Sequence, residues 1–193
     1  QPRSVEMAKK YEVPIYVKSS FSDEGGTLVT KEDKEMEKEV VSGVTYDRDQ
    51  AKITVINVPD RPGIAARLFT PLAEHNIMVD MIIQNASVDG FTDLTFTVSR
   101  KDVKQAAVLV REAANDIGAA RVEIDDSVAK VSIIGVGMVS HSGVAAKMFT
   151  ILAKEGINIE MISTSEIKIS CVVKAKYTEL AVMVLHDAFE LEK

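Results

Sequence analysis

Hydrophobic and polar residues change period several times along the chain, and these changes predict a regular series of strands and helices. Short apolar runs alternate with longer segments in which apolar residues recur every three or four positions. The first of these longer segments, for example, places Ile64, Leu68 and Leu72 on one helical face. The predicted order is strand, helix, strand, strand, helix and strand, at residues 53–58, 63–75, 79–85, 92–98, 102–117 and 122–124. An Asp-Gly pair at 89–90 is typical of a hairpin turn, and Gly118 is placed to cap the second helix.

The same series begins again near residue 131, which indicates an internal repeat. Its strand, helix, two strands and helix are expected at residues 131–136, 143–155, 157–164, 167–173 and 177–189. When residues 63–82 are placed on residues 143–162, an offset of 80, ten of the twenty positions are identical. Chance agreement at ~5% per position gives about one identity, so the chain carries a duplication.

Each copy predicts an α+β module of the ferredoxin-like βαββαβ type, an antiparallel sheet with two helices on one face. The second copy ends before its closing strand, whereas the apolar segment 40–44 has no partner in the first copy. We therefore expect residues 40–44 to complete the second sheet, so that the two modules are interleaved.

The residues before the repeat follow a different pattern. A helix at 4–10, a strand at 13–18 and a turn at 22–26 are too few to bury a core, so they are expected to be the tail of a larger domain. Gln1, in place of an initiator Met, adds the expectation of a processed chain or a fragment of a longer one. The expected organisation is the tail of a larger domain, a charged linker, a strand of the second module, the first module and the second module, at residues 1–30, 31–39, 40–46, 47–127 and 128–193.

Composition narrows the class of protein. The chain has 193 residues, 46% of them apolar, a formal charge of −6 and only 5% aromatic residues, which argues against a nucleic-acid surface. It has no apolar run near ~20 residues, which argues against a membrane span. The single cysteine, Cys171, alternates with apolar neighbours and is expected to be a buried small hydrophobe. A chain without a disulfide framework is typical of the cytoplasm.

The turn at 59–63, Pro-Asp-Arg-Pro-Gly, has two interpretations. In the structural one, Asp60 caps the following helix and Pro62 occupies its first turn. In the functional one, the free amides of residues 63–65 bind a carboxylate at the positive helix end, and Asp60 receives an ammonium group. Together these groups fit an amino acid. In the second copy Ser140 replaces Asp60, so the two copies are not expected to be equivalent sites.

Polar residues also cluster after the second strand of each copy. Gln84, Asn85 and Ser87 follow it in the first copy, and residues 163–166 in the second. Such residues form turns, or alternatively line a groove that binds a small polar ligand. Residues 158–160 precede the second of these clusters and can offer backbone groups to a neighbouring chain.

The chain contains no recognisable catalytic constellation. His75, His141 and His186 lie on unrelated elements, which argues against a shared metal site. A phosphate-binding loop, a serine elbow and a cysteine–histidine pair are all missing from the sequence. We therefore predict no catalytic residue and no metal ligand.

These features together resemble a known family. The turn at 59–63, the repeat and the segment Asn-Ile-Glu-Met-Ile-Ser-Thr-Ser-Glu at 158–166 resemble the paired ACT regulatory domains of aspartokinases. Residues 3–8, 13–15 and 19–28 resemble the end of the kinase domain in that family. The resemblance implies an enzyme that phosphorylates the side-chain carboxylate of aspartate with MgATP. Its catalytic residues would lie outside this sequence, so the chain is expected to be inactive alone and to need no cofactor itself.

The resemblance also implies a ligand and a partner. In the family, threonine or lysine binds between the first ACT copy of one chain and the second copy of its dimer partner. Carried over to this sequence, the effector contacts are Asp60, Gly63, Ile64, Ala65, Gln84, Ser87, Asn158, Ile159 and Ser165.

The leading hypothesis is a cytoplasmic, dimeric module for feedback inhibition in lysine and threonine biosynthesis, associated with a kinase domain. A ligand can regulate only if it binds one arrangement of the modules better than another. The alternative is a structural dimerisation module without a bound effector. A third hypothesis, that the chain is itself an enzyme, has no motif to support it.

Overall fold

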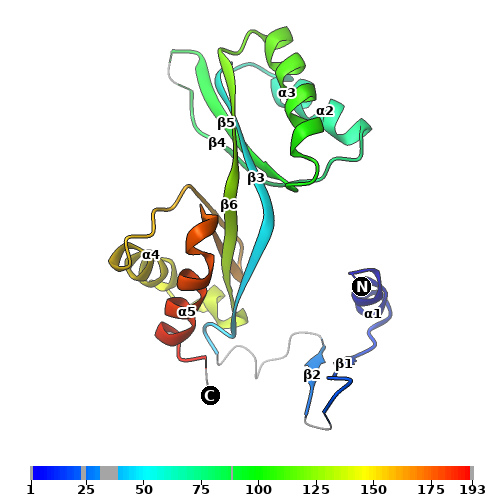
Figure 1. Ribbon diagram of the computed structural model, residues 1–193, viewed down its shortest axis with the longest axis vertical. Coiled ribbons are helices and arrows are strands. Elements are labelled where there is room, and N and C mark those ends of the chain that lie inside the picture. The colour runs from blue at the N-terminus through cyan, green and yellow to red at the C-terminus, as the bar shows by residue number, and fades with distance from the viewer. Residues whose placement is uncertain (1, 23–24, 31–38, 88, 192–193) are drawn as a thin grey trace.

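The computed structural model describes residues 2–22, 25–30, 39–87 and 89–191. The N-terminal part contains the helix α1 and a small antiparallel hairpin, and it lies apart from the rest of the chain (Figure 1). Its elements are α1 (Pro2–Tyr11), β1 (Ile15–Val17) and β2 (Thr27–Val29). The sequence pattern did not predict β2, because its three residues are all exposed and show no alternation. The predicted charged linker at 31–39 falls outside the described residues except for Glu39.

The remainder forms one six-stranded sheet in the order β4-β5-β3-β6-β8-β7, with every neighbouring pair antiparallel. The strands are β3 (Gly43–Pro59), β4 (Val79–Gln84), β5 (Phe91–Val98), β6 (Arg121–Ile134), β7 (Met161–Thr164) and β8 (Lys168–Lys174). The helices are α2 (Ile64–Glu74), α3 (Val103–Ile117), α4 (Val144–Lys154) and α5 (Thr178–Ala188), with 3-10 turns at Val136–Ser140 and Ala175–Tyr177. These helices agree with the predicted ones to within one or two residues at each end.

Two long strands, β3 and β6, each belong to both modules. Residues 43–47 pair with residues 130–134, and residues 52–56 pair with residues 121–125. The prediction of separate strands at 40–44 and 53–58, and again at 122–124 and 131–136, is therefore wrong in detail, because each pair is one continuous strand. The predicted interleaving is confirmed, since the start of β3 supplies the fourth strand beside β6, β8 and β7 (Figure 1).

Two β-bulges mark the junction between the modules. Gln50 lies opposite Val128 in the β3–β6 ladder, and the register shifts on both sides of that pair. Residues 126–127 lie opposite a single residue of β3, and residues 48–49 lie opposite a single residue of β6. Each bulge offsets the side-chain alternation by one, so both modules keep their apolar residues on the same face of the sheet.

That face carries two hydrophobic cores, one under each helix pair. The first core joins α2 and α3 to β3 and β5, and its largest fully buried side chain is Phe96, which makes an edge-to-face contact with Phe69 at 5.1 Å. The second core joins α4 and α5 to β6 and β8 around Met148 and Leu152. We call these two halves the first module and the second module. A third, small cluster lies between them and consists of Met81, Val128, Met161 and Val172.

Candidate functional site

The turn before α2 has an uncapped helix end. Gly63 has φ +89°, a left-handed conformation that favours glycine, and α2 begins at the next residue without a side-chain cap. The Ile64 amide donates to the Arg61 carbonyl at 3.4 Å. The prediction that Asp60 caps α2 with Pro62 in its first turn is therefore wrong, because the left-handed glycine starts the helix later and turns the chain away from Asp60.

Asp60 itself is exposed beside this helix end. Its amide donates to the Gly90 carbonyl at 2.8 Å, which fixes the turn against the β4–β5 loop. Within the described residues its carboxylate makes no hydrogen bond or ion pair. A free negative group and the positive end of a helix thus lie in one five-residue turn.

Gln84 and Ser87 lie at the same end of the first module. Gln84 ends β4 opposite Leu94, a residue of the first core, so its side chain projects on the helix-bearing face of the sheet. Ser87 is exposed in the loop that follows, and Thr92 Oγ1 ties this loop down by donating to the Asn85 carbonyl at 2.9 Å. The structure therefore brings Asp60, residues 63–65 and the end of β4 to one end of the first module.

The second module keeps the helix end and lacks the free carboxylate. Gly143 also has φ +89° and starts α4 without a side-chain cap. Ser140, at the place of Asp60, donates through Oγ to the Gly137 carbonyl at 3.2 Å, and His141 Nδ1 lies 2.8 Å from the same carbonyl. The hydroxyl at the equivalent position is thus engaged within its own turn.

Asn158, Ile159 and Ser165 flank β7 in the second module. Asn158 and Ile159 precede the strand and Ser165 follows it, so these three residues flank the two ends of β7. Because β4 and β7 are opposite edges of the sheet, one chain alone does not bring Asn158 and Ile159 to the Asp60 turn.

The two edge strands expose equivalent apolar residues. Ile82 of β4 is 55% exposed and Ile162 of β7 is 42% exposed, and the repeat offset of 80 relates the two positions. Their cross-strand partners, Phe96 and Cys171, are core residues, so both isoleucines project on the helix-bearing face at an open edge.

Cys171 is fully buried and free, as predicted, and burial raises the pKa of its thiol to about 12. Among the described residues, His, Cys, Asp and Glu form no cluster suited to a metal ion. No described helix is both long and apolar enough to cross a membrane.

A polar network at the junction was not predicted from the sequence. Lys52 of β3 forms an ion pair with Glu160, just before β7, and Lys130 of β6 forms one with Asp80 of β4. The hydrogen bond from Lys52 lowers the pKa of Glu160, and burial opposes this shift. The available signal was the repeat: Lys52 and Lys130 are equivalent at an offset of 78, and Asp80 and Glu160 at an offset of 80.

The fold and the two uncapped helix turns place the chain among ACT-domain proteins. Family models described as ACT domain match residues 52–116 and residues 131–189. An aspartokinase of Pseudomonas aeruginosa is 52% identical over 194 residues, which cover 100% of this chain and 47% of that protein.

Solved structures agree with this similarity. The ligand-free regulatory subunit of aspartate kinase from Thermus thermophilus is 43% identical, has a TM-score of 0.73, and covers 78% of this chain and 99% of its own. E. coli aspartokinase III, in complex with lysine and aspartate, is 25% identical with a TM-score of 0.70 over 100% of this chain and 42% of its own. The chain belongs to the aspartokinase family and corresponds to its regulatory region. It spans about half the length of the curated relatives it matches.

Proposed function

We propose that this chain is the part of an aspartokinase that binds lysine or threonine and thereby controls the phosphorylation of aspartate by MgATP. The observation that carries the proposal is the unengaged Asp60 carboxylate beside the uncapped N-terminus of α2. An amino acid presents a carboxylate and an ammonium group a few ångströms apart, and this turn offers a partner for each.

In this arrangement the effector carboxylate accepts hydrogen bonds from the amides of Gly63, Ile64 and Ala65, and Asp60 accepts from its ammonium group. The Ile64 amide would exchange its long bond to the Arg61 carbonyl, 3.4 Å, for the ligand. Gln84 and Ser87, at the same end of the first module, then contact the rest of the ligand. Support comes from E. coli aspartokinase III, whose structure was solved in complex with lysine and aspartate.

The second half of the site would come from a dimer partner. The exposed edges β4 and β7 suit a homodimer in which the first module of one chain lies beside the second module of the other. Asn158 of the partner subunit and Ile159 of the partner subunit would then close the site over Asp60. Ser165 of the partner subunit, in the loop that follows β7, would contribute to the same interface.

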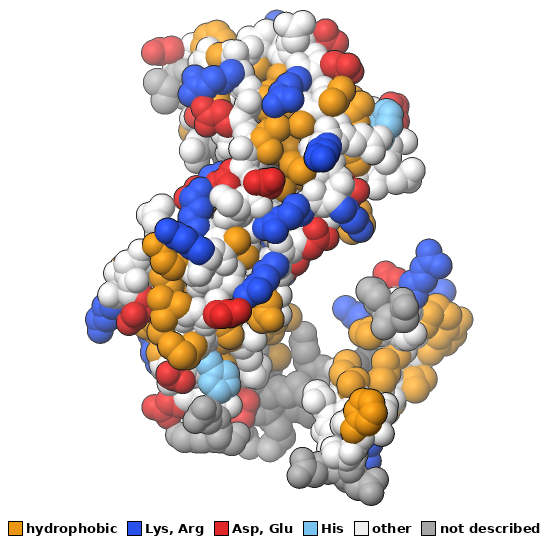
Figure 2. Space-filling view, viewed as in Figure 1, with side chains coloured by type: hydrophobic (Ala, Val, Ile, Leu, Met, Phe, Trp, Pro, Cys, Tyr) orange, Lys and Arg blue, Asp and Glu red, His pale blue; other side chains and the backbone are white. Residues whose placement is uncertain are grey.

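The N-terminal part would belong to the kinase domain, which would hold MgATP and the catalytic residues in the cytoplasm. Its short elements expose many apolar side chains, visible as orange atoms in Figure 2, and a groove of about 520 Å³ separates α1 from the hairpin. Such a surface suits the remainder of a domain. The exposed apolar residues are Val5, Met7, Tyr11, Val13, Tyr16, Val17, Phe21, Leu28 and Val29.

Calorimetric titration with threonine and with lysine tests this function. We expect heat of binding with at least one of them, and a loss of about ten-fold or more in affinity for Asp60→Asn, because a charge-assisted hydrogen bond is lost. Asp187→Asn removes the same charge from an exposed position on α5 and serves as the control, with unchanged affinity.

The structural alternative rests on the exposed Ile82 and Ile162, which suit a dimer interface whether or not a ligand binds. Sedimentation equilibrium run beside the titration separates the two functions. A stable dimer that gives no heat and no thermal shift with either amino acid at millimolar concentration would establish the alternative and refute effector binding.

A further inference from the structure

The junction between the modules is held by charged side chains on the face of the sheet that carries no helix. Lys52, Asp125 and the equivalent Lys130 all project on this face, as does the small cluster containing Met81 and Met161. Basic and acidic side chains lie side by side where the two modules meet (Figure 2). A network of opposite charges therefore surrounds the apolar contact between the two halves.

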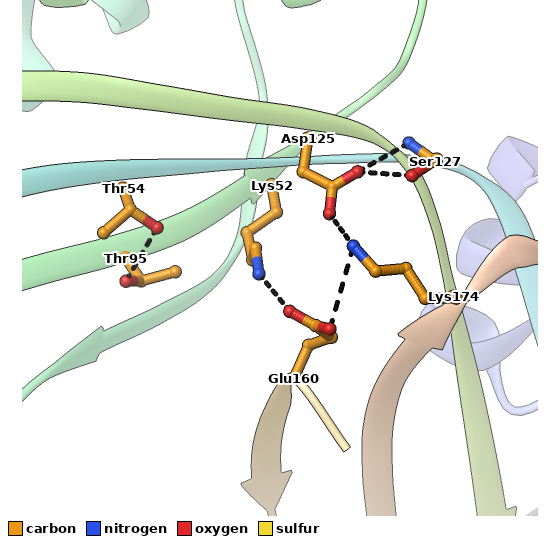
Figure 3. Close-up of polar contacts among 7 residues, drawn as sticks. All are labelled: Lys52, Thr54, Thr95, Asp125, Ser127, Glu160 and Lys174. Carbon is orange, nitrogen blue, oxygen red and sulfur yellow. Dashed lines mark hydrogen bonds and ion pairs between the residues drawn. The ribbon is translucent and has the colours of Figure 1, made fainter. Parts of the chain in front are cut away.

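The bond from Lys52 to Glu160 is the centre of this network (Figure 3). Only 17% of the Lys52 side chain and 18% of the Glu160 side chain is exposed, so the pair is shielded from solvent. Glu160 also lies 3.7 Å from Lys174, which is paired with Asp125, and Asp125 accepts from Ser127. Removal of one partner would leave a charge largely buried, which is costly.

An equivalent bond joins the modules in the opposite direction. Lys130 of the second module reaches Asp80 of the first, as Lys52 of the first reaches Glu160 of the second. The two acidic residues differ in their backbone setting. Asp80 lies inside β4. This strand pairs with β5 before residue 80, through Val79, and after it, through Ile82. Glu160 lies just before β7, and its amide donates to the Val172 carbonyl at 2.8 Å.

Asn158 and Ile159 lie in the short connection just before this point. The connection is fixed on one side by Ile157, whose amide donates to the Leu152 carbonyl at 2.9 Å. On the other side it is fixed by Glu160, through the bond to Val172 and through the ion pair to Lys52. Among the described residues, the side chain of Glu160 is thus the one polar tie from this connection to the other module.

We propose that Glu160, held by Lys52, is a positioning residue that fixes the conformation of Asn158 and Ile159 for effector binding. This inference rests on the proposed function. Glu160 does not touch the ligand. It restricts the backbone beside two residues that do, so less ordering is needed when the effector binds.

The test compares Glu160→Gln with the matched variant Asp80→Asn in the full chain. Two quantities are measured: amide hydrogen exchange at Asn158 and Ile159 without ligand, and the dissociation constant for threonine or lysine by calorimetry. For Glu160→Gln we expect about ten-fold faster exchange at both amides and about ten-fold weaker binding, within the usual range of coupling between sites. Asp80→Asn also removes one inter-module ion pair, and it should change neither quantity more than about two-fold, because β4 remains paired on both sides of residue 80.

Lys52→Met provides an independent variant and a double-mutant cycle. Because the two residues act as a unit, Lys52→Met combined with Glu160→Gln should weaken binding no more than either change alone. Unchanged exchange and affinity in Glu160→Gln would overturn the inference, and so would an equal loss in Asp80→Asn, which would make the effect one of general junction stability. If the unaltered chain bound neither amino acid, the proposed function would fail, and hydrogen exchange alone would still decide whether Glu160 orders the connection.

Discussion

Replacement of Leu152 by alanine should destabilise both modules together, although Leu152 belongs to the second module alone. Its side chain is fully buried in the second core. The strands β3 and β6 run through both modules and share eleven paired positions, five in each module and one at the junction. Neither module can unfold without releasing a strand that completes the other, so the six-stranded sheet should open as one cooperative unit.

The size of the effect follows from the buried volume. A Leu→Ala change in a well-packed core costs about 2–5 kcal/mol. A loss of about 3 kcal/mol corresponds to a fall of roughly 100-fold in the protection of amides that exchange only by global unfolding. Native-state hydrogen exchange should therefore show this fall at the amides of β8 and, to the same extent, at those of β5 in the first module. The reciprocal variant, Leu72→Ala in the first core, should give the same pattern.

Met183→Ala is the control, because Met183 lies on α5 in the second module and is 55% exposed. Protection in both modules should stay within a few-fold of the unaltered chain. If Leu152→Ala lowered protection in β8 alone and left β5 unchanged, the modules would open independently. Such a result would refute cooperative opening of the six-stranded sheet.

Three further predictions concern pH, backbone conformation and thiol reactivity. Burial is the largest single influence on the pKa of Asp125 and raises it, but the hydrogen bonds from Lys174 and Ser127 and the charge of Lys174 together outweigh burial and lower that pKa to about 2. The stabilisation is present above the unfolded pKa near 3.8, so urea unfolding should show a loss of about 1–2 kcal/mol as pH falls from 5 to 2, and Asp125→Asn should remove this dependence. Gly63→Ala, at φ +89°, should lower the free energy of unfolding by about 1 kcal/mol, measured by thermal unfolding. Gly43→Ala is the control, because an added Cβ there would meet nothing within 4 Å, and it should lower that free energy by less than about half as much. Equal losses would show that the left-handed conformation of Gly63 is not the cause. The buried Cys171 thiol, with a pKa raised to about 12, should react with a thiol reagent only at the rate of unfolding, and rapid labelling of the folded chain would disprove its burial.

The sequence was sufficient for the repeat, the βαββαβ order and the interleaving, because each depends on local periodicity and on counting strands. It was insufficient for the continuity of β3 and β6. Residues 45–50 and 125–127 are mostly polar, and they interrupt the apolar alternation that identifies a strand. Those polar residues form the bulges, where Asp125 Oδ1 accepts from the Ser127 amide at 3.0 Å and Asp47 Oδ1 from the Asp49 amide at 2.9 Å. Local side-chain bonds thus replace the ladder where the pattern stops.

The site was predicted less completely than the fold. Asp60, Gln84 and the start of α2 lie at the same end of the first module, since local turn chemistry and strand order determine their positions. The structural interpretation, in which Asp60 caps the helix, is wrong because residue preferences favour aspartate as a cap but do not fix where the helix begins, and the left-handed Gly63 starts α2 at residue 64. The bond between Lys52 and Glu160 joins residues 108 apart in sequence, so only the folded sheet reveals it.

The two copies differ where they would bind a ligand and agree where they contact each other. Lys52 and Lys130 occupy equivalent positions at the junction, and each forms an ion pair with an acidic residue of the other copy. An aspartate, Asp47 or Asp125, precedes each bulge. A change on one side of such a contact would leave a buried charge in the other copy, so its members constrain one another. The helix turns have no such constraint, because each faces outward, and there Asp60 is matched by Ser140, whose hydroxyl is already engaged. The junction is therefore symmetric because its members must match one another, whereas the turns differ, and among the described residues only the turn of the first module carries a free carboxylate at this position.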